Sequence, residues 1–488
     1  MTRNSTLILL LLFVTGCTSE SPPPAPLVFY CAAGLKPAVS AVITAYGKET
    51  GRSVETQYGG SGTLLSSLQL ASVADLYLAA DESYIETARA KKLVAESIPV
   101  ASMRAVIAVP KGNPKGIRSI KDLLRADVSY ALANPDQAAV GRKVRKLLQE
   151  TGEWATVAEN VRVYKPTVTE VANDILLGAV DAGLIWDATA NLYEKLEGVA
   201  VEVFASSATK VTIGIATRSK HPTAALKFAR YLTASDRGLI HFAAKGFAPA
   251  DGDPWAEHPE VLVHIGAMLR PGIEADIKEF EAREGCSLQT VYNGCGILVA
   301  QMKAGDRPDA YVSCDLSFMD DVQDLFLPSH VLTENDMVIV VQKGNPKGIS
   351  GLQDLTREGT RLGLAHRKNS ALGALTYRLA TAQGLVDGLE ANRVVDSATG
   401  DYLMNQIRAG SLDAVIVYRS NAMNHPANLA EHLDLIEIGL PGSTAIQPYA
   451  VARQTPYKQL LARFFDHVLS PASRARFETV GFRWASAP

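Results

Sequence analysis

The stretch Tyr58-Gly59-Gly60-Ser61-Gly62-Thr63 places three glycines around one hydroxyl group, directly after the β-type run at residues 54–58. A helical pattern follows at residues 63–70. Glycine-rich turns between a strand and a helix expose backbone N–H groups, and the helix N-terminus adds a partial positive charge. We therefore expect a strand, a turn and a helix that together can hold an anion. Such turns also serve as plain connectors, so the context decides.

The context is a second copy of the same stretch. It returns as Tyr292-Asn293-Gly294-Cys295-Gly296-Ile297, 234 residues later. The heptapeptide Lys111-Gly112-Asn113-Pro114-Lys115-Gly116-Ile117 also returns unchanged at residues 343–349, with an offset of 232 residues. Seven identical residues at a matched position indicate a duplication. The copies predict a first module over residues 27–249 and a second, diverged module over 261–486, joined by a short polar linker over 250–260.

Each repeat alternates short apolar strands with helical patterns, which predicts an α/β fold with mostly parallel sheets. Buried strands are expected to begin near Leu27 and Leu262 and to cover residues 74–81 and 308–315. A repeat of roughly 225 residues is large for one sheet, so we expect two α/β lobes with a ligand cleft in each module. Ligands of open α/β sheets lie at the carboxyl ends of the strands, where the small-residue turns of the first repeat are expected.

Composition sets the class of protein. Of 488 residues, 47% are hydrophobic and 20% are charged, and the net charge is −3. These values are typical of a globular protein, and the length predicts more than one domain. No basic surplus points to nucleic acid, so no nucleic-acid partner is expected.

The N-terminus has the features of an export signal. Residues 7–14 form an apolar run after Arg3, and this run is too short to span a bilayer. The following Val14-Thr15-Gly16-Cys17 resembles the bacterial lipobox, which implies a signal peptide over residues 1–16 and lipidation of Cys17. The Ser/Pro-rich residues 17–26 would then tether an exported, periplasmic or cell-surface lipoprotein to a membrane.

Four further cysteines are unevenly distributed: Cys31 falls in the first module, and Cys286, Cys295 and Cys314 fall in the second. They lack the paired spacing of a zinc site and show no disulfide framework that both modules share. We expect small buried thiols. Because Cys295 and Cys314 fall at expected edges of the cleft, a disulfide or thiolate chemistry with a metal oxyanion stays open.

Five motifs occur in a fixed order along the first repeat. They are Ala-Ala-Gly-Leu at 32–35, Gly-Gly-Ser-Gly at 59–62, Ala-Asp-Leu-Tyr-Leu-Ala-Ala-Asp at 74–81, Asn-Pro-Asp at 134–136 and Val-Asp-Ala-Gly-Leu-Ile-Trp at 180–186. This order resembles the periplasmic molybdate/tungstate-binding proteins of ABC importers. The resemblance covers nearly all of residues 27–249 and, more weakly, 261–484. It implies a type II periplasmic-binding fold whose two lobes close on a tetrahedral oxyanion.

Carried over by position, the resemblance implies a ligand site made of Gly34, Ser61, Val140, Val168 and Trp186. Glycine and the valines would donate backbone N–H groups, Ser61 its hydroxyl and N–H, and Trp186 its indole N–H. Many family members have serine at the position of Gly34 and tyrosine at that of Trp186. Enough such donors can hold a dianion without a counter-charge in a dry cleft. The valines and Trp186 are also ordinary core residue types.

The matching positions of the second module are Met268, Cys295, Leu372, Gly400 and Tyr418. The backbone N–H groups at these positions can still donate hydrogen bonds to an anion. Cys295, however, offers only a weak S–H donor, and Met268 is bulky. Tyr418 restores the aromatic residue that is usual in the family. The second cleft would bind the same anion, bind another ligand or serve as a scaffold.

The resemblance implies a function in transport. The protein would capture molybdate or tungstate outside the cytoplasmic membrane and deliver it to an ABC importer permease, without a cofactor or a metal besides the ligand. Sulfate or phosphate as the ligand, or a sensory or storage role, stays open. An enzyme is not expected, because Thr63 breaks the Gly-x-Ser-x-Gly elbow and the histidines form no His-x-x-x-His pair.

Overall fold

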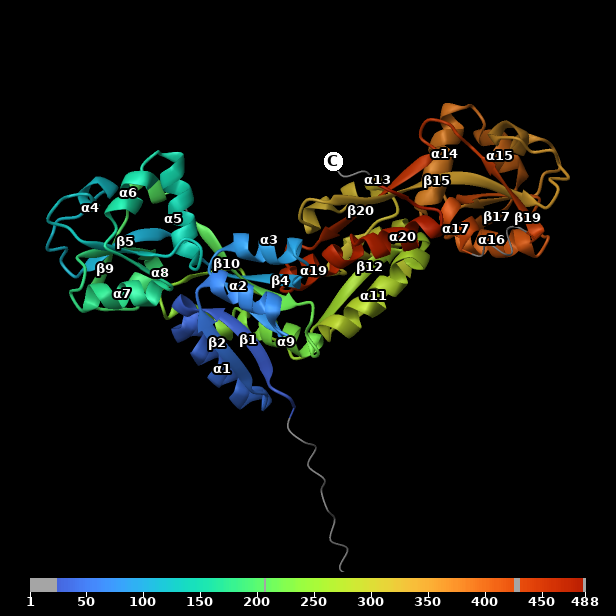
Figure 1. Ribbon diagram of the computed structural model, residues 1–488. Helices are drawn as coiled ribbons and strands as arrows, with labels where there is room; N and C mark the ends of the chain where they lie inside the picture. The colour runs from blue at the N-terminus through green and yellow to red at the C-terminus, as the bar shows by residue number, and fades with distance from the viewer. Residues whose placement is uncertain (1–23, 206–207, 425–430, 486–488) are drawn as a thin grey trace, which may run out of the picture.

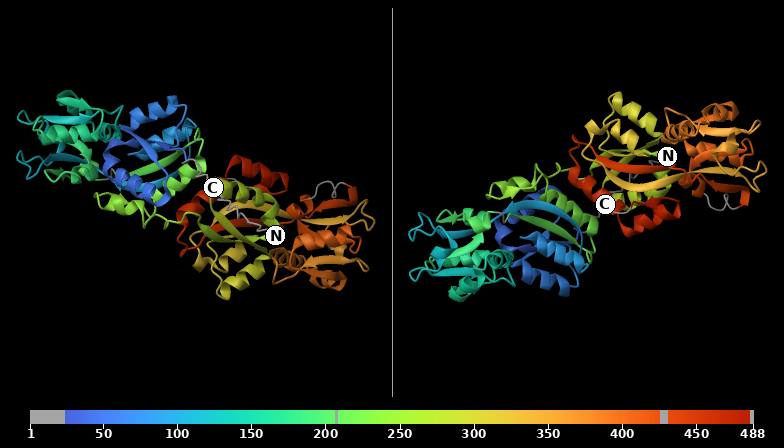
Figure 2. Two further views of the ribbon diagram at one scale, coloured as in Figure 1. Left: turned by 90° about the horizontal axis from the view of Figure 1, so that it is seen from below. Right: turned by 90° about the horizontal axis from the view of Figure 1, so that it is seen from above.

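The computed structural model describes residues 24–205, 208–424 and 431–485. The expected signal peptide and Cys17 lie outside the described residues. Within the described part of the chain, no helix is both long and apolar enough to cross a membrane. Two modules lie side by side and each has two lobes, so that an outer lobe stands at either end of an elongated molecule (Figures 1 and 2).

The inner lobe of the first module comes from both ends of the repeat. Its elements are β1 (Leu27–Ala32), α1 (Lys36–Thr50), β2 (Val54–Gly59), α2 (Ser61–Leu70), β3 (Leu76–Ala79), α3 (Glu82–Ala90), β4 (Val94–Met103), β10 (Thr209–Ala216), α9 (Pro222–Leu232), α10 (Gly238–Ala243) and β11 (Ala248–Pro249). The strands form one sheet in the order β11-β4-β10-β3-β1-β2. β1 is parallel to β2 and β3, whereas β10 is antiparallel to β3 and β4.

The outer lobe of the first module is the middle of the repeat. Its elements are β5 (Ala105–Pro110), α4 (Ile120–Leu123), β6 (Tyr130–Ala133), α5 (Ala139–Glu150), α6 (Trp154–Asn160), β7 (Val163–Lys165), α7 (Val168–Leu176), β8 (Ala182–Trp186), α8 (Asp187–Asn191) and β9 (Leu196–Val199). The sheet order is β7-β6-β8-β5-β9. Only Arg104 separates β4 of the inner lobe from β5, so the chain crosses between the lobes almost without leaving a strand.

The second module repeats this plan. Its inner lobe holds β12 (Glu260–Gly266), α11 (Arg270–Glu284), β13 (Ser287–Asn293), α12 (Cys295–Lys303), β14 (Ala310–Val312), α13 (Leu316–Asp320), β20 (Thr444–Val451), α19 (Lys458–Val468), α20 (Pro471–Thr479) and β21 (Arg483–Trp484). Its outer lobe holds β16 (Leu362–Ala365), α14 (Ala371–Ala382), α15 (Val386–Asn392), β17 (Arg393–Ser397), α16 (Gly400–Arg408), β18 (Ala414–Tyr418), α17 (Arg419–Met423) and β19 (Leu433–Glu437).

One long strand joins the two lobes of the second module. β15 (His330–Gln342) pairs with β20 in the inner lobe and with β18 and β19 in the outer lobe. It therefore corresponds to both β4 and β5 of the first module. It also pairs with β21, and all four of its pairings are antiparallel, so the prediction of mostly parallel sheets is wrong near the crossing. The reason is topological: strands that carry the chain out to the outer lobe and back must run in opposite directions.

The two modules meet through their inner lobes, where α9 contacts α11. Glu284 at the end of α11 is 1% exposed and lies between two arginines. Arg463 of α19 donates to its carboxylate at 2.6 and 3.1 Å, and Arg230 of the first module donates at 3.1 Å. Asp253 of the connecting segment accepts from the backbone N–H of Leu460 at 2.8 Å. This buried charge network fixes one module against the other.

Candidate functional site

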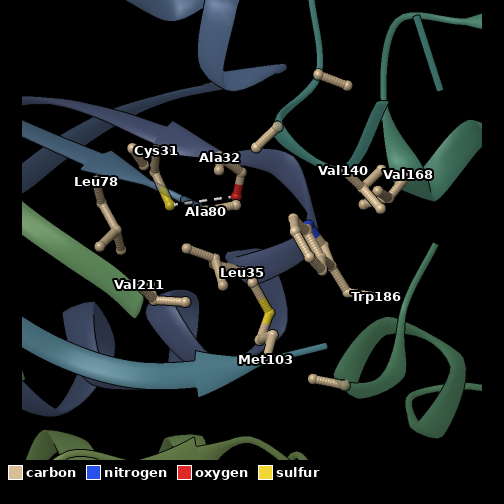
Figure 3. Close-up of a cluster of buried hydrophobic side chains, with 14 of the residues drawn as sticks. Cys31, Ala32, Leu35, Leu78, Ala80, Met103, Val140, Val168, Trp186 and Val211 are labelled. Atoms are coloured by element: carbon tan, nitrogen blue, oxygen red, sulfur yellow. Dashed lines mark hydrogen bonds between the residues drawn. The ribbon is translucent and has the colours of Figure 1, made fainter. Parts of the chain in front are cut away.

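The carboxyl ends of the central strands bring the first site together. β1 and β2 end side by side, because their register pairs Ala32 with Gly59. A 3-10 turn (Ala33–Leu35) follows β1, and α2 begins at Ser61. The outer lobe contributes the beginnings of α5 and α7 and the end of β8 at Trp186. Figure 3 shows Val140, Val168 and Trp186 facing the ends of the inner-lobe strands.

A small cavity of about 20 Å³ lies between the lobes at this place. Gly34, Ser61, Val168 and Trp186 line it, together with Ala138, Ala139 and Thr167 of the outer lobe. Val140 is fully buried as the second residue of α5, but it is not part of the lining. The first residues of a helix have N–H groups without partners inside the helix, so α2, α5 and α7 all present donors at this cavity.

Ser61 is held so that its hydroxyl hydrogen stays available. Its side chain is 1% exposed, and its Oγ accepts a hydrogen bond from the Ala80 N–H at 3.2 Å. Its backbone carbonyl accepts from the Tyr77 hydroxyl at 2.8 Å. Burial raises the pKa of Tyr77 well above its ordinary value, so this donor remains protonated. An Oγ that already accepts a hydrogen bond points its own O–H toward a further acceptor.

Two of the three glycines of the motif, Gly60 and Gly62, let the lobes touch. A Cβ at Gly60 would lie 2.3 Å from the Gln137 carbonyl oxygen and 2.7 Å from the Pro166 carbonyl oxygen. A Cβ at Gly62 would lie 2.4 Å from the Asp136 carbonyl oxygen. The Gly62 N–H instead donates to the Gln137 carbonyl at 2.8 Å, across the two lobes. Glycine is therefore needed here for close approach of the opposite lobe, in addition to any contact with a ligand.

Gly34 stands in a similar position on the neighbouring turn. A Cβ there would lie 2.9 Å from Val168 Cγ2 and 3.2 Å from Thr189 Oγ1. Thr189 is 1% exposed, and its hydroxyl has no hydrogen-bond partner among the described residues. The space that a serine side chain would take at position 34 is thus already occupied, and a hydroxyl group stands beside it.

Charge is absent from the lining of the first cavity. Among the described residues, those that line it have aliphatic, hydroxyl or indole side chains, and none is acidic or basic. The nearby Lys36 places its Nζ 5.3 Å from the centre of the Tyr58 ring. The arrangement offers uncharged N–H and O–H donors to a ligand, and it holds no nucleophile with an adjacent base among the lining residues that the structure describes.

The second module has a matching cavity of about 20 Å³. All five positions taken from the repeat line it: Met268, Cys295, Leu372, Gly400 and Tyr418. Here too glycines admit the opposite lobe, because a Cβ at Gly294 would lie 2.6 Å from the Asn369 carbonyl oxygen. Unlike the first cavity, this one includes a charged residue, Asp401, in its lining.

Two cysteines of the second cavity form a disulfide. Cys295 and Cys314 are bonded, so the expectation of buried thiols is wrong for this pair, and the disulfide left open by the sequence is the one observed. Cys31 and Cys286 are buried free thiols, as expected. The Cys314 N–H donates to Cys295 Sγ at 3.0 Å, as Ala80 does to Ser61 in the first module.

Gly266 lies next to this disulfide and leaves room for its sulfur atoms. A Cβ at Gly266 would lie 2.3 Å from Cys314 Sγ and 2.9 Å from Cys295 Sγ. The first module has Ala32 at the corresponding place. The sulfur atoms therefore fill the volume of the missing methyl group.

The fold and the paired clefts define a class. Residues 27–248 and 261–483 each match the family of bacterial extracellular solute-binding proteins. Because the two matches cover most of the chain, the protein belongs to this family, as a tandem of two modules with the type II periplasmic-binding fold. Its class is that of the bacterial proteins that bind solutes outside the cell.

Each of the following relatives matches about half of this chain. A binding protein of Haemophilus influenzae is 29% identical over 234 residues, which are 48% of this chain and 95% of that protein. The molybdate-binding protein ModA of Mycobacterium bovis is 27% identical over 251 residues, 50% of this chain and 92% of its own. A Bacillus subtilis protein named as an ABC transporter substrate-binding lipoprotein is 27% identical over 251 residues, 48% of this chain and 93% of its own.

Some residues that line the two cavities are not among the positions predicted from the sequence. Ala138, Ala139 and Thr167 lie at the beginnings of α5 and α7, next to positions that were selected. Asp401 and Asn421 line the second cavity. Comparison of the two repeats could have identified Asp401. The 232-residue offset aligns it with Thr169, so a carboxylate replaces a hydroxyl at the beginning of a helix.

Proposed function

We propose that the first module captures molybdate or tungstate and delivers it to the permease of an ABC importer. The observation that supports this most is a cavity whose described lining offers several N–H and O–H donors and no charged side chain. The relatives named as molybdate-binding proteins support the same ligand class. Molybdate and tungstate carry no proton at neutral pH, so N–H and O–H donors can satisfy all of their oxygen atoms.

The ligand would be held by both lobes at once. From the inner lobe, Gly34 and Ser61 donate backbone N–H groups and Ser61 adds its hydroxyl. From the outer lobe, the beginnings of α5 and α7, with Val140 and Val168, donate N–H groups, and Trp186 adds its indole N–H. The helix dipoles favour negative charge at the same point. Thr189, whose hydroxyl lies beside Gly34 and has no partner among the described residues, would supply the hydroxyl that Gly34 lacks.

Binding would be coupled to closure of the lobes. The contacts of Gly60 and Gly62 with carbonyl groups of the outer lobe form only when the lobes are together. Closure excludes water, and this strengthens every hydrogen bond to the anion. Lipidation at Cys17 would keep the exported protein at the membrane, close to its permease.

Calorimetric titration of the mature chain with molybdate, tungstate, sulfate and phosphate tests the proposal. We expect molybdate and tungstate to bind tightly in the first cleft, with sulfate weaker because the ion is smaller. A first module that binds neither molybdate nor tungstate would refute the assignment. Tight binding of sulfate in their place would make the protein a carrier of another tetrahedral oxyanion.

A further inference from the structure

The second cavity has the features of a working binding site. Three helices of at least nine residues, α12, α14 and α16, begin at its wall. Tyr418 also lines it, and this side chain is 3% exposed. Its hydroxyl has no hydrogen-bond partner among the described residues. A buried hydroxyl group that lacks a hydrogen-bond partner destabilises the folded protein. The Tyr418 hydroxyl therefore indicates a ligand that forms a hydrogen bond with it.

The donors of this cavity differ from those of the first. Cys295, which takes the place of Ser61, is bonded to Cys314 and has no hydrogen to donate. Of the side-chain donors at the positions taken from the repeat, Tyr418 remains, on the opposite wall, where it ends β18 as Trp186 ends β8 in the first module. Burial raises the pKa of Tyr418 well above its ordinary value, so its hydroxyl keeps its hydrogen.

Asp401 adds an acceptor that the first cavity lacks. It is the second residue of α16, and its Oδ1 accepts from Asn421 Nδ2 at 3.0 Å. Asn421 is 5% exposed, and its Oδ1 in turn accepts from the Tyr418 N–H at 3.2 Å. The carboxylate is thus oriented by the same asparagine that packs beside Tyr418, and no other hydrogen bond to it occurs within the described residues.

A carboxylate in the wall of an anion site selects by protonation. It repels a fully deprotonated dianion, and it accepts a hydrogen bond from an oxyanion that retains an O–H. At neutral pH sulfate and molybdate carry no proton, whereas the phosphate ions, and phosphonates that have lost only part of their protons, carry at least one. We propose that the second cleft binds a tetrahedral oxyanion that retains a proton, with hydrogenphosphate as the model ligand, through the helix N-termini, the Tyr418 hydroxyl and the Asp401 carboxylate.

The inference does not depend on the ligand of the first cleft, and glycine variants separate the two. Gly60→Val should block closure of the first cleft, and Gly294→Val should block closure of the second, because each added side chain meets carbonyl groups of the opposite lobe. Phosphate binding should survive Gly60→Val and disappear in Gly294→Val. Loss of molybdate binding in Gly60→Val reports separately on the proposed function.

The charge itself is tested by Asp401→Asn, with Asp387→Asn as the matched control. Asp387 is exposed and also stands in the first turn of a helix, α15, of the same lobe. Phosphate and sulfate have nearly the same size, so calorimetry with both ions in the Gly60→Val chain isolates the effect of the proton. We expect a preference for phosphate that Asp401→Asn reduces at least tenfold, as for loss of a hydrogen bond to a charged group, and that Asp387→Asn leaves unchanged.

Three results would overturn the proposal: no binding of phosphate by the mature chain, phosphate binding that survives Gly294→Val, or a phosphate-to-sulfate ratio that Asp401→Asn does not alter. If the Gly60→Val chain does not fold, the same comparison of Asp401→Asn with Asp387→Asn is made in the otherwise unchanged chain. There the phosphate affinity of the second cleft should still fall at least tenfold.

Discussion

In the proposed site, Ser61 is the side chain on which we expect anion binding in the first cleft to depend most. Replacing it with alanine removes the hydroxyl donor and leaves the Ala80 N–H without its partner. We expect Ser61→Ala to weaken molybdate binding by roughly 1.5 to 3 kcal/mol, the range for a hydrogen bond to a charged group. Calorimetry gives the value directly. Ser66→Ala, at an exposed site on the same helix, is the control, and equal affinities for the two variants would remove Ser61 from the site.

At the residue scale, four of the five positions predicted for the first site line one cavity, and Val140 does not. Gly34, Ser61, Val168 and Trp186 line one cavity, as their place in the motifs suggested. The role of Gly60 was beyond reach, because the carbonyl groups that it admits belong to Gln137 and Pro166, far along the chain. Contacts made only when two lobes close have no signature in either local segment.

At the scale of elements, the Cys295–Cys314 disulfide adds a covalent link to the backbone hydrogen bond that both modules have at this place. The double variant Cys295→Ser, Cys314→Ala has the same two residues as the first module, where Ser61 and Ala80 occupy these positions. We expect the second module to lose about 3 kcal/mol of stability, the chain-entropy value for a loop of this length. Denaturant unfolding measures it. Reductant should destabilise the unchanged chain similarly and leave the double variant unaffected; equal stability of the two proteins would contradict the prediction.

Elements were predicted in type more reliably than in extent. The expected strands at 74–81 and 308–315 are present only as β3 (Leu76–Ala79) and β14 (Ala310–Val312). Their last residues leave the sheet because they line the cleft or cap the next helix, as Asp81 and Asp315 do. Apolar character continues into these turns, so the pattern alone could not mark the end of the strand. Strand direction was also hidden, because antiparallel pairing depends on the crossing between lobes.

At the scale of the whole molecule, Glu284 holds the modules together. Glu284→Gln would leave Arg230 and Arg463 buried without a counter-charge. Breaking a buried pair in this way costs about 3 to 5 kcal/mol. Glu274→Gln on the same helix breaks only exposed pairs, with Arg270 and Lys278, and should cost less than about 1 kcal/mol. Thermal unfolding of the two variants checks the contrast, and similar losses would show that the buried network does not stabilise the interface.

The same network predicts a dependence on pH. Burial alone would raise the pKa of Glu284, but the charges of Arg463 and Arg230 hold it below the ordinary value. A carboxyl group with a lowered pKa stabilises the folded state above the pKa of the unfolded chain, and it loses that contribution as pH falls through the folded pKa. We expect the stability of the unchanged chain to decline below about pH 4 more steeply than that of Glu284→Gln. Parallel acid-unfolding curves would contradict this.

The central claim is that uncharged donors from two lobes hold the anion in the first module. A crystal structure of the mature chain grown with molybdate, phased at the molybdenum absorption edge, tests it most directly. We expect an anomalous peak between the beginnings of α2, α5 and α7, with oxygen atoms at hydrogen-bonding distance from Ser61 and without a lysine or arginine in contact. A peak elsewhere, or a bound anion neutralised by a basic side chain, would contradict the account.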